Sequence, residues 1–163
     1  MKWFQNPQTL EELKKQYKKL AMQHHPDLGG DTATMQEINN EYDSLFEQLK
    51  NTHTNANGET YTATVETKEA PEEFRNIINV LISLKGINIE VCGSWLWITG
   101  NTREYKEIFK SLKFRWSKSK QAWYYHTSDY RKKSKKTYSL NEIRDLYGSQ
   151  TIQAEPEMQV AIV

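Results

Sequence analysis

The residues best suited to do chemistry in this chain are His25, Pro26 and Asp27, a consecutive triplet that joins an imidazole, a rigid ring and a carboxylate. A tripeptide alone is weak evidence, because short motifs recur by chance and this one also suits an ordinary turn. Its meaning depends on the residues around it. A lysine-rich stretch precedes the triplet, and Gly29 and Gly30 lie shortly after it.

Two stretches with the apolar periodicity of a helix flank the triplet. Residues 10–22 and 35–49 carry apolar side chains at the same steps: Leu10, Leu13, Tyr17, Leu20 and Ala21 in the first, and Met35, Ile38, Tyr42, Leu45 and Phe46 in the second. Each stripe must be buried, and the nearest apolar surface is the other stripe. Pro26 cannot continue a helix, and the glycines allow the chain to reverse. The sequence therefore predicts an antiparallel helical hairpin with the triplet at its tip.

Start signals agree with these two helices. Thr9 and Glu12 form a capping box at the head of the first helix. Thr34 and Glu37 have the same form at the head of the second helix, and Asp31 is an alternative N-cap one turn earlier. The two helices are therefore expected to begin after Thr9 and after either Asp31 or Thr34.

The hairpin resembles a J-domain, the module of DnaJ-type co-chaperones. The resemblance lies in residues 13–21, 24–27 and 36–42, and it covers roughly residues 3–49 of the chain. It implies that this part docks on the ATP-bound form of a DnaK-type chaperone and stimulates ATP hydrolysis there. The chain would itself make and break no bond, so we expect a protein that is not an enzyme.

The resemblance also implies roles for individual residues. His25, Pro26 and Asp27 would form the loop that triggers hydrolysis. The basic docking surface would consist of four lysines of the first helix: Lys14, Lys15, Lys18 and Lys19. These lysines form two i,i+4 pairs of like charge, and an acidic partner would relieve their repulsion. The alternative is an ordinary solvated helix face.

The N-terminus departs from the family pattern. J-domains usually open with a longer helix that carries its own apolar stripe, whereas only residues 1–6 precede Pro7 here. Trp3 and Phe4 are available to cover the hairpin in place of that helix. The sequence therefore predicts a trimmed J-domain.

Composition and charge divide the chain of 163 residues into four parts. We expect a J-domain over residues 1–50, a flexible linker over 51–70, a basic and aromatic-rich domain over 71–150 and a flexible tail over 151–163. Alternation from Tyr61 to Val65 leaves a short strand in the linker as the alternative. The net charge is +1, but residues 71–150 carry 15 Lys and Arg against eight Asp and Glu. The positive charge therefore belongs to the second domain.

Several classes of function are not expected. The single cysteine, Cys92, cannot form an internal disulfide, so a reducing cytoplasm is the expected location. The chain has no apolar stretch long enough to span a bilayer and no signal-peptide core, so we expect no membrane partner. Three of the four histidines, His25, His53 and His126, are scattered and the one cysteine offers no pair, so we expect no metal. No phosphate-cradling glycine loop occurs, and we expect no cofactor.

The second domain shows alternating helix and strand patterns in the order α-β-β-α-β-β-α. Pro71 starts a helix, residues 87–91 and 95–99 form two strands, and residues 114–116 and 122–125 form a hairpin around a polar turn. A last short helix begins after Ser139, which forms a capping box with Glu142. The predicted fold class is therefore α+β: the N-terminal helical hairpin, then a small antiparallel sheet with helices on one face.

Basic and aromatic residues alternate in this second domain. We expect a surface for a client protein or a nucleic acid at eight positions: Arg115, Trp116, Lys118, Lys120, Trp123, Tyr125, Lys132 and Lys133. Cations beside flat rings suit single-stranded nucleic acid, through phosphate pairing and base stacking. Residues 114–117 and 122–124 also resemble a hairpin of plasmid and phage accessory proteins. The alternative is that several of these rings belong to the core.

The sequence thus favours a co-chaperone in the cytoplasm. Its hairpin would recruit a DnaK-type chaperone ATPase, and its C-terminal domain would deliver that activity to a client protein whose identity the sequence does not give. The second hypothesis is a nucleic-acid-binding accessory protein of plasmid or phage type that uses the basic C-terminal domain.

Overall fold

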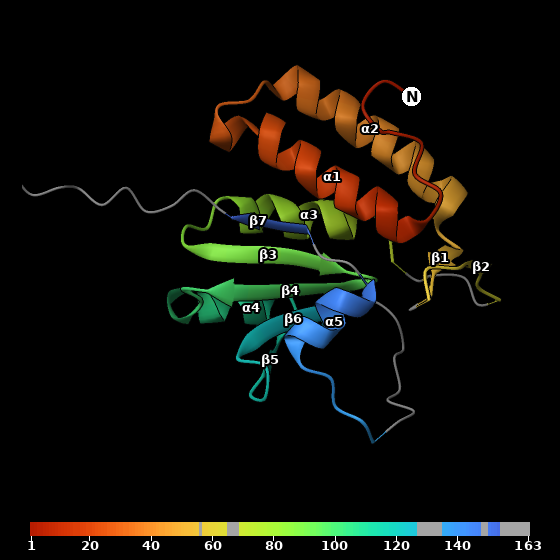
Figure 1. Cartoon of the computed structure of the whole chain (residues 1–163). Coiled ribbons are helices and arrows are strands. Elements are labelled where there is room, and N and C mark those ends of the chain that lie inside the picture. The colour runs from red at the N-terminus through yellow and green to blue at the C-terminus, as the bar shows by residue number, and fades with distance from the viewer. Residues whose placement is uncertain (56, 65–68, 127–134, 148–149, 154–163) are drawn as a thin grey trace, which may run out of the picture.

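Two helices pack side by side at the N-terminal end of the chain (Figure 1). The computed structural model describes residues 1–55, 57–64, 69–126, 135–147 and 150–153. Helix α1 spans Leu10–His24 and helix α2 spans Thr32–Leu49, with the short 3₁₀ turn η1, Pro26–Leu28, between them. The predicted apolar stripes face each other, and the rings of Tyr17 and Tyr42 lie 4.5 Å apart at the centre of the pair.

The two helices begin where their capping residues stand. The Thr9 hydroxyl accepts a hydrogen bond from the Glu12 amide at 3.4 Å, as the capping box predicts. Helix α2 begins after Asp31, whose carboxylate accepts from the Thr34 amide at 2.8 Å. Of the two predicted start sites, the earlier one is therefore correct.

Residues expected to form a flexible linker instead contain a small antiparallel sheet. Its strands are β1, Thr52–Thr54, and β2, Thr60–Thr62. The buried carboxylate of Glu11 in α1 holds β1 in place: it contacts the His53 Nδ1 atom at 2.8 Å and accepts from the Thr54 amide at 3.1 Å. The Glu11 carboxylate of the first helix therefore helps to anchor this segment.

The second half of the chain forms a five-stranded antiparallel sheet in the order β5-β6-β4-β3-β7. Its strands are β3 (Ile87–Cys92), β4 (Trp95–Gly100), β5 (Arg115–Ser117), β6 (Ala122–His126) and β7 (Gln150–Gln153). Strand β7 was not predicted. It extends into the segment expected to be a flexible tail, and its Ile152 lies opposite Ile89 of β3.

Helices cover both faces of this sheet, so the prediction that they lie on one face is wrong (Figure 1). Helices α3, Pro71–Ile82, and α4, Lys106–Ser111, cover one face, with the 3₁₀ turn η2, Arg103–Tyr105, leading into α4. Helix α5, Leu140–Tyr147, covers the other face. The second face needs a cover because Cys92 and Trp97 make it apolar as well.

One apolar core runs from the helical hairpin to the sheet. Phe74 of α3 is almost fully buried, with its ring 6.1 Å from that of Tyr17 and 6.2 Å from that of Tyr42. Helix α3 therefore adds apolar cover to the hairpin. The described part of the chain has mixed helix and sheet, as an α+β fold requires, and contains no helix with the length and apolarity needed to cross a membrane.

Candidate functional site

The triplet forms a compact turn at the tip of the helical hairpin. Helix α1 ends as the His25 amide donates to the Ala21 carbonyl, at 2.9 Å. The His25 backbone is extended, and its Nδ1 atom accepts a hydrogen bond from the Asp27 amide at 3.2 Å. Its carbonyl oxygen accepts from the amides of Leu28 and Gly30, each at 2.9 Å. Backbone hydrogen bonds on both sides of His25 therefore fix the shape of the tip.

Two glycines allow this turn to close. Gly29 has a φ of +88°, a conformation that a residue with a Cβ atom adopts only with strain. Gly30 approaches the end of α1 so closely that a Cβ atom there would overlap the His24 carbonyl group. The return of the chain into α2 thus depends on the absence of a side chain at residue 30.

In this turn the Asp27 carboxylate is exposed to solvent, whereas the His25 imidazole is largely covered. The Asp27 side chain is 63% exposed, whereas the His25 side chain is 13% exposed and lies 3.7 Å from the Asp27 carboxylate. Pro26 and Leu28 are also exposed. Asp27 is therefore the residue of the triplet that can meet a partner directly, and His25 shapes the loop from within.

The N-terminal segment supports the hairpin. The Glu41 carboxylate in α2 accepts hydrogen bonds from the amides of Lys2 and Trp3, at 2.9 and 3.2 Å. These bonds and the positive N-terminus lower the pKa of Glu41, although burial of the carboxyl acts in the opposite direction. The Trp3 ring packs edge-on against His24, with the ring centroids 5.2 Å apart, and Phe4 is buried. Trp3 and Phe4 thus cover the hairpin as predicted.

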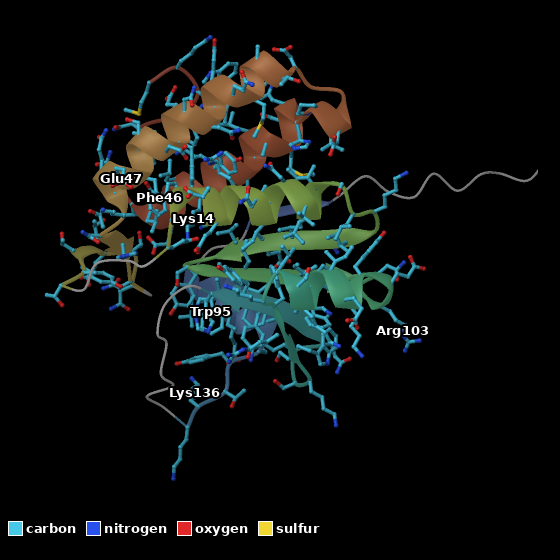
Figure 2. All side chains as sticks on the ribbon, turned by 180° about the vertical axis from the view of Figure 1, so that it is seen from behind. Lys14, Phe46, Glu47, Trp95, Arg103 and Lys136 are labelled. Carbon is cyan, nitrogen blue, oxygen red and sulfur yellow. The ribbon has the colours of Figure 1, made fainter. Side chains whose placement is uncertain are left out.

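The predicted basic docking face is not a continuous exposed surface. Lys14 is buried where α1 meets α3, and its ammonium forms an ion pair with the Glu69 carboxylate (Figure 2). The same ammonium lies 5.0 Å from the centroid of the Phe74 ring. The expectation of an accessible surface is therefore wrong for Lys14, because Glu69 and Phe74 pack over it. These two residues belong to the C-terminal half of the molecule, by which we mean the described residues from 69 onward.

Lys18 lies one turn further along α1 and is also buried. Its ammonium donates a hydrogen bond to the Ile89 carbonyl of β3. Burial lowers the pKa of Lys18 to about 8, although Glu90 and Cys92 act in the opposite direction. The expectation of a solvated lysine is wrong here too.

The other two lysines remain accessible. Lys19 is exposed. Lys15 is half-buried, and its ammonium donates to the Tyr147 carbonyl of α5 at 3.3 Å. The four lysines thus divide into an accessible pair and a pair held against the C-terminal half.

The second predicted surface is also only partly exposed. Trp116 is 43% exposed on the edge strand β5, and Arg115 and Lys118 beside it are exposed. Trp123 is buried and Tyr125 is half-buried against the main core, so these two rings belong chiefly to the packing.

Three lysines of the predicted client or nucleic-acid surface, Lys120, Lys132 and Lys133, do not add to the exposed surface around Trp116 that the structure describes. Lys120 is half-buried, and its ammonium lies 5.8 Å from the centroid of the Trp97 ring on the other face of the sheet. Lys132 and Lys133 lie outside the described residues. The exposed part of the surface is therefore centred on Trp116.

Sequence reasoning missed Glu69 and Glu90, two buried acidic residues that form ion pairs with cationic side chains. Glu69 pairs with Lys14, and Glu90 of β3 pairs with Arg144 of α5 through two contacts of 2.7 and 2.8 Å. Glu69 lies in the polar segment before α3, where nothing in the local pattern marks it as buried. Glu90 lies in a strand in which apolar and polar residues alternate, a pattern that is typical of a strand with one face in solvent.

No family model, no curated protein and no solved structure matched this chain.

Proposed function

We propose that this protein is a J-domain co-chaperone that docks on a DnaK-type chaperone and stimulates its ATP hydrolysis. The observation that carries the proposal is the exposed Asp27 carboxylate, held in a hydrogen-bonded turn between two packed helices. The resemblance of residues 3–49 to J-domains supplies the partner and the reaction that it promotes.

The geometry of the tip suits a triggering contact. The turn is already shaped by its backbone hydrogen bonds, so little conformational entropy is lost when a partner binds it. An exposed carboxylate can enter a charge-assisted hydrogen bond with a cationic group, and such a bond is stronger than a neutral one. Asp27 would therefore determine the lifetime and productivity of the complex, whereas the accessible Lys15 and Lys19 would speed the encounter.

Single-turnover ATP hydrolysis by a DnaK-type chaperone tests this proposal. We expect the wild-type chain to accelerate hydrolysis and Asp27→Asn to remove the acceleration, with helicity unchanged because Asp27 is not in the core. The matched control is Glu47→Gln on α2, which neutralises a carboxylate of similar exposure, 61%, away from the tip. His25→Gln is a less specific variant, because it also removes the acceptor of the Asp27 amide.

The outcomes separate a functional residue from a structural one. Acceleration that survives in Asp27→Asn would contradict the proposed trigger. Loss of helicity in Asp27→Asn would show that Asp27 serves the fold. Equal loss in Glu47→Gln would mean that total charge matters and that the triplet has no special role.

We assign client selection to the C-terminal half, because the hairpin provides only the contact with the chaperone. A pull-down with the full chain, compared with a Trp116→Ala variant, tests whether the exposed ring on β5 takes part in client binding.

A specific observation supports a second candidate function, the binding of single-stranded nucleic acid. Trp116 offers an exposed ring for base stacking, and Arg115 and Lys118 offer cations for phosphates on the same hairpin. Binding of a fluorescent single-stranded oligonucleotide should then weaken steeply with salt and fall in Trp116→Ala. If oligonucleotide binding is unchanged in Trp116→Ala and in Lys132→Glu/Lys133→Glu, neither the hairpin with Trp116 nor the basic segment with Lys132 and Lys133 binds the nucleic acid.

A further inference from the structure

We propose that the observed structure is a closed state of the co-chaperone, in which the C-terminal half withholds Lys14 and Lys18 from the chaperone. In the open state, the lysine face of α1 separates from Glu69 and β3 and becomes available to the acidic surface of the partner. This inference rests on the proposed function and adds a regulation of the same site.

The contacts of the two lysines carry the inference. Both ammonium groups are held by acceptors of the C-terminal half: Lys14 by the Glu69 carboxylate and Lys18 by the Ile89 carbonyl oxygen. An acidic partner would offer the same kind of acceptor. Because one ammonium cannot be buried against β3 and against a separate protein at the same time, closure and docking compete for these two lysines.

The burial of two lysines is itself unusual for a permanent interior. A buried ion pair contributes little net stability, and apolar residues of similar volume often serve as well or better. The neighbouring positions of α1 that pack against α2, Leu13 and Tyr17, are apolar or aromatic, as a permanent interface favours. Lysines at positions 14 and 18 are explained if the chain also has a state in which these groups meet water or a charged partner.

Opening moves Glu69, α3 and β3 together, because α3 begins next to Glu69 and packs on β3 in the same apolar core. The hairpin therefore also gives up the contacts of Phe74 with Tyr17 and Tyr42 and the ion pair of Arg75 with Asp43 at 2.9 Å. A client that binds the sheet and favours this movement would raise chaperone recruitment, because a ligand shifts a population by its differential affinity for the two states.

Substitution of Glu69 in the full chain tests the proposal without touching any lysine. Glu69→Gln removes the partner of Lys14, and Glu69→Lys adds repulsion, so both should favour the open state, the second more strongly. Two measurements are needed. Labelling of amines, read by mass spectrometry at Lys14 and Lys18, reports opening, and single-turnover ATP hydrolysis by a DnaK-type chaperone reports docking.

We expect labelling of Lys14 and Lys18 to rise by about tenfold or more, since an uncompensated buried charge is strongly unfavourable. The concentration of this protein that gives half-maximal stimulation of ATP hydrolysis should fall several-fold, and it should fall further in Glu69→Lys than in Glu69→Gln. Glu107→Gln and Glu107→Lys are the matched controls, because Glu107 pairs with the exposed Lys110 on α4 and the two substitutions change the charge by the same amounts. Addition of Asp27→Asn to Glu69→Lys should remove the stimulation.

Other results would overturn the proposal. If labelling rises but stimulation stays at the wild-type level, the co-chaperone function holds and the regulation does not. If the lysines of the wild-type chain are already labelled as fast as Lys19, or if neither Glu69 variant exposes them, no closed state of this kind exists. If no variant stimulates hydrolysis although labelling shows that the lysines are free, the proposed function itself fails.

Discussion

Lys14 and Glu69 form an ion pair whose two side chains are only 5% and 0% exposed, although the residues lie 55 positions apart in the sequence. The pair joins the helical hairpin to the segment that leads into α3. It therefore links the proposed chaperone-binding half of the molecule to the half that carries the sheet.

Removal of one partner should be costly. Glu69→Gln leaves the Lys14 charge without its carboxylate, which lowers the free energy of unfolding by at most about 3–5 kcal/mol, less if α1 opens and returns Lys14 to water. The double variant Lys14→Met/Glu69→Leu should recover most of that loss. Urea denaturation of the wild type, Glu69→Gln, Lys14→Met, Glu69→Leu and the double variant measures both effects. Losses that simply add in the double variant would contradict an interaction between the two residues.

The pH dependence of stability should reveal the buried Lys18. Its pKa falls from 10.5 to about 8 on folding, so above about pH 8 the unfolded chain binds more protons and the free energy of unfolding rises with pH. Burial raises the pKa of Cys92 from 9.0 to about 11, which has the opposite effect above pH 9.0. From about pH 8 to about pH 9, the stability of the wild type should therefore rise relative to that of Lys18→Met, by up to about 1 kcal/mol. Equal pH profiles would mean that Lys18 titrates normally.

The tip should not tolerate a side chain at residue 30. Gly30→Ala places a methyl group into the His24 carbonyl and must displace the backbone, so chaperone stimulation should be lost while His25 and Asp27 are unchanged. Gly29→Ala has open space around the new methyl group and strains only its positive φ, at a cost of about 1 kcal/mol. Thermal unfolding and ATP hydrolysis of both variants provide the comparison. Equal effects would show that backbone strain is the dominant factor at the tip.

Phe74→Ala should destabilise both halves of the protein together. The ring is buried between the hairpin and the sheet, and its removal should cost about 3–5 kcal/mol. Far-UV circular dichroism reports mainly on the helices, and the tryptophans lie mostly in the sheet. The two signals should shift together in one transition. Separate transitions would show that the halves are independent domains.

Truncation should lower the stability much more at Trp123 than at Trp116, although the two rings lie only 5.6 Å apart. Trp123→Ala removes a buried ring and should cost about 3–5 kcal/mol. Trp116→Ala removes an exposed one and should change stability by less than about 1 kcal/mol. Loss of client or oligonucleotide binding in Trp116→Ala alone would identify it as a contact residue. A large loss of stability in that variant would show that Trp116 is part of the core.

The sequence alone determined the helical hairpin, because its information is local. The apolar stripes, the capping residues Thr9 and Asp31, and the combination of Pro26 with two glycines each act within a few residues. The strands β3 to β6 followed from alternation and turn signals in the same way. The triplet could be placed at an accessible turn for this reason, and the structure leaves Asp27 exposed there.

Only the tertiary structure decided which charged residues are buried. Lys14, Lys15, Lys18 and Lys19 look equivalent in the sequence, but they lie on different sides of α1. Glu69 and α3 cover Lys14, and β3 covers Lys18. Glu69 carries no local sign of burial, because its partner comes from a distant helix. Strand β7 and the position of α5 likewise depend on pairing with β3 and on the apolar second face of the sheet. Long-range packing determines these features, and no window of the sequence contains both partners.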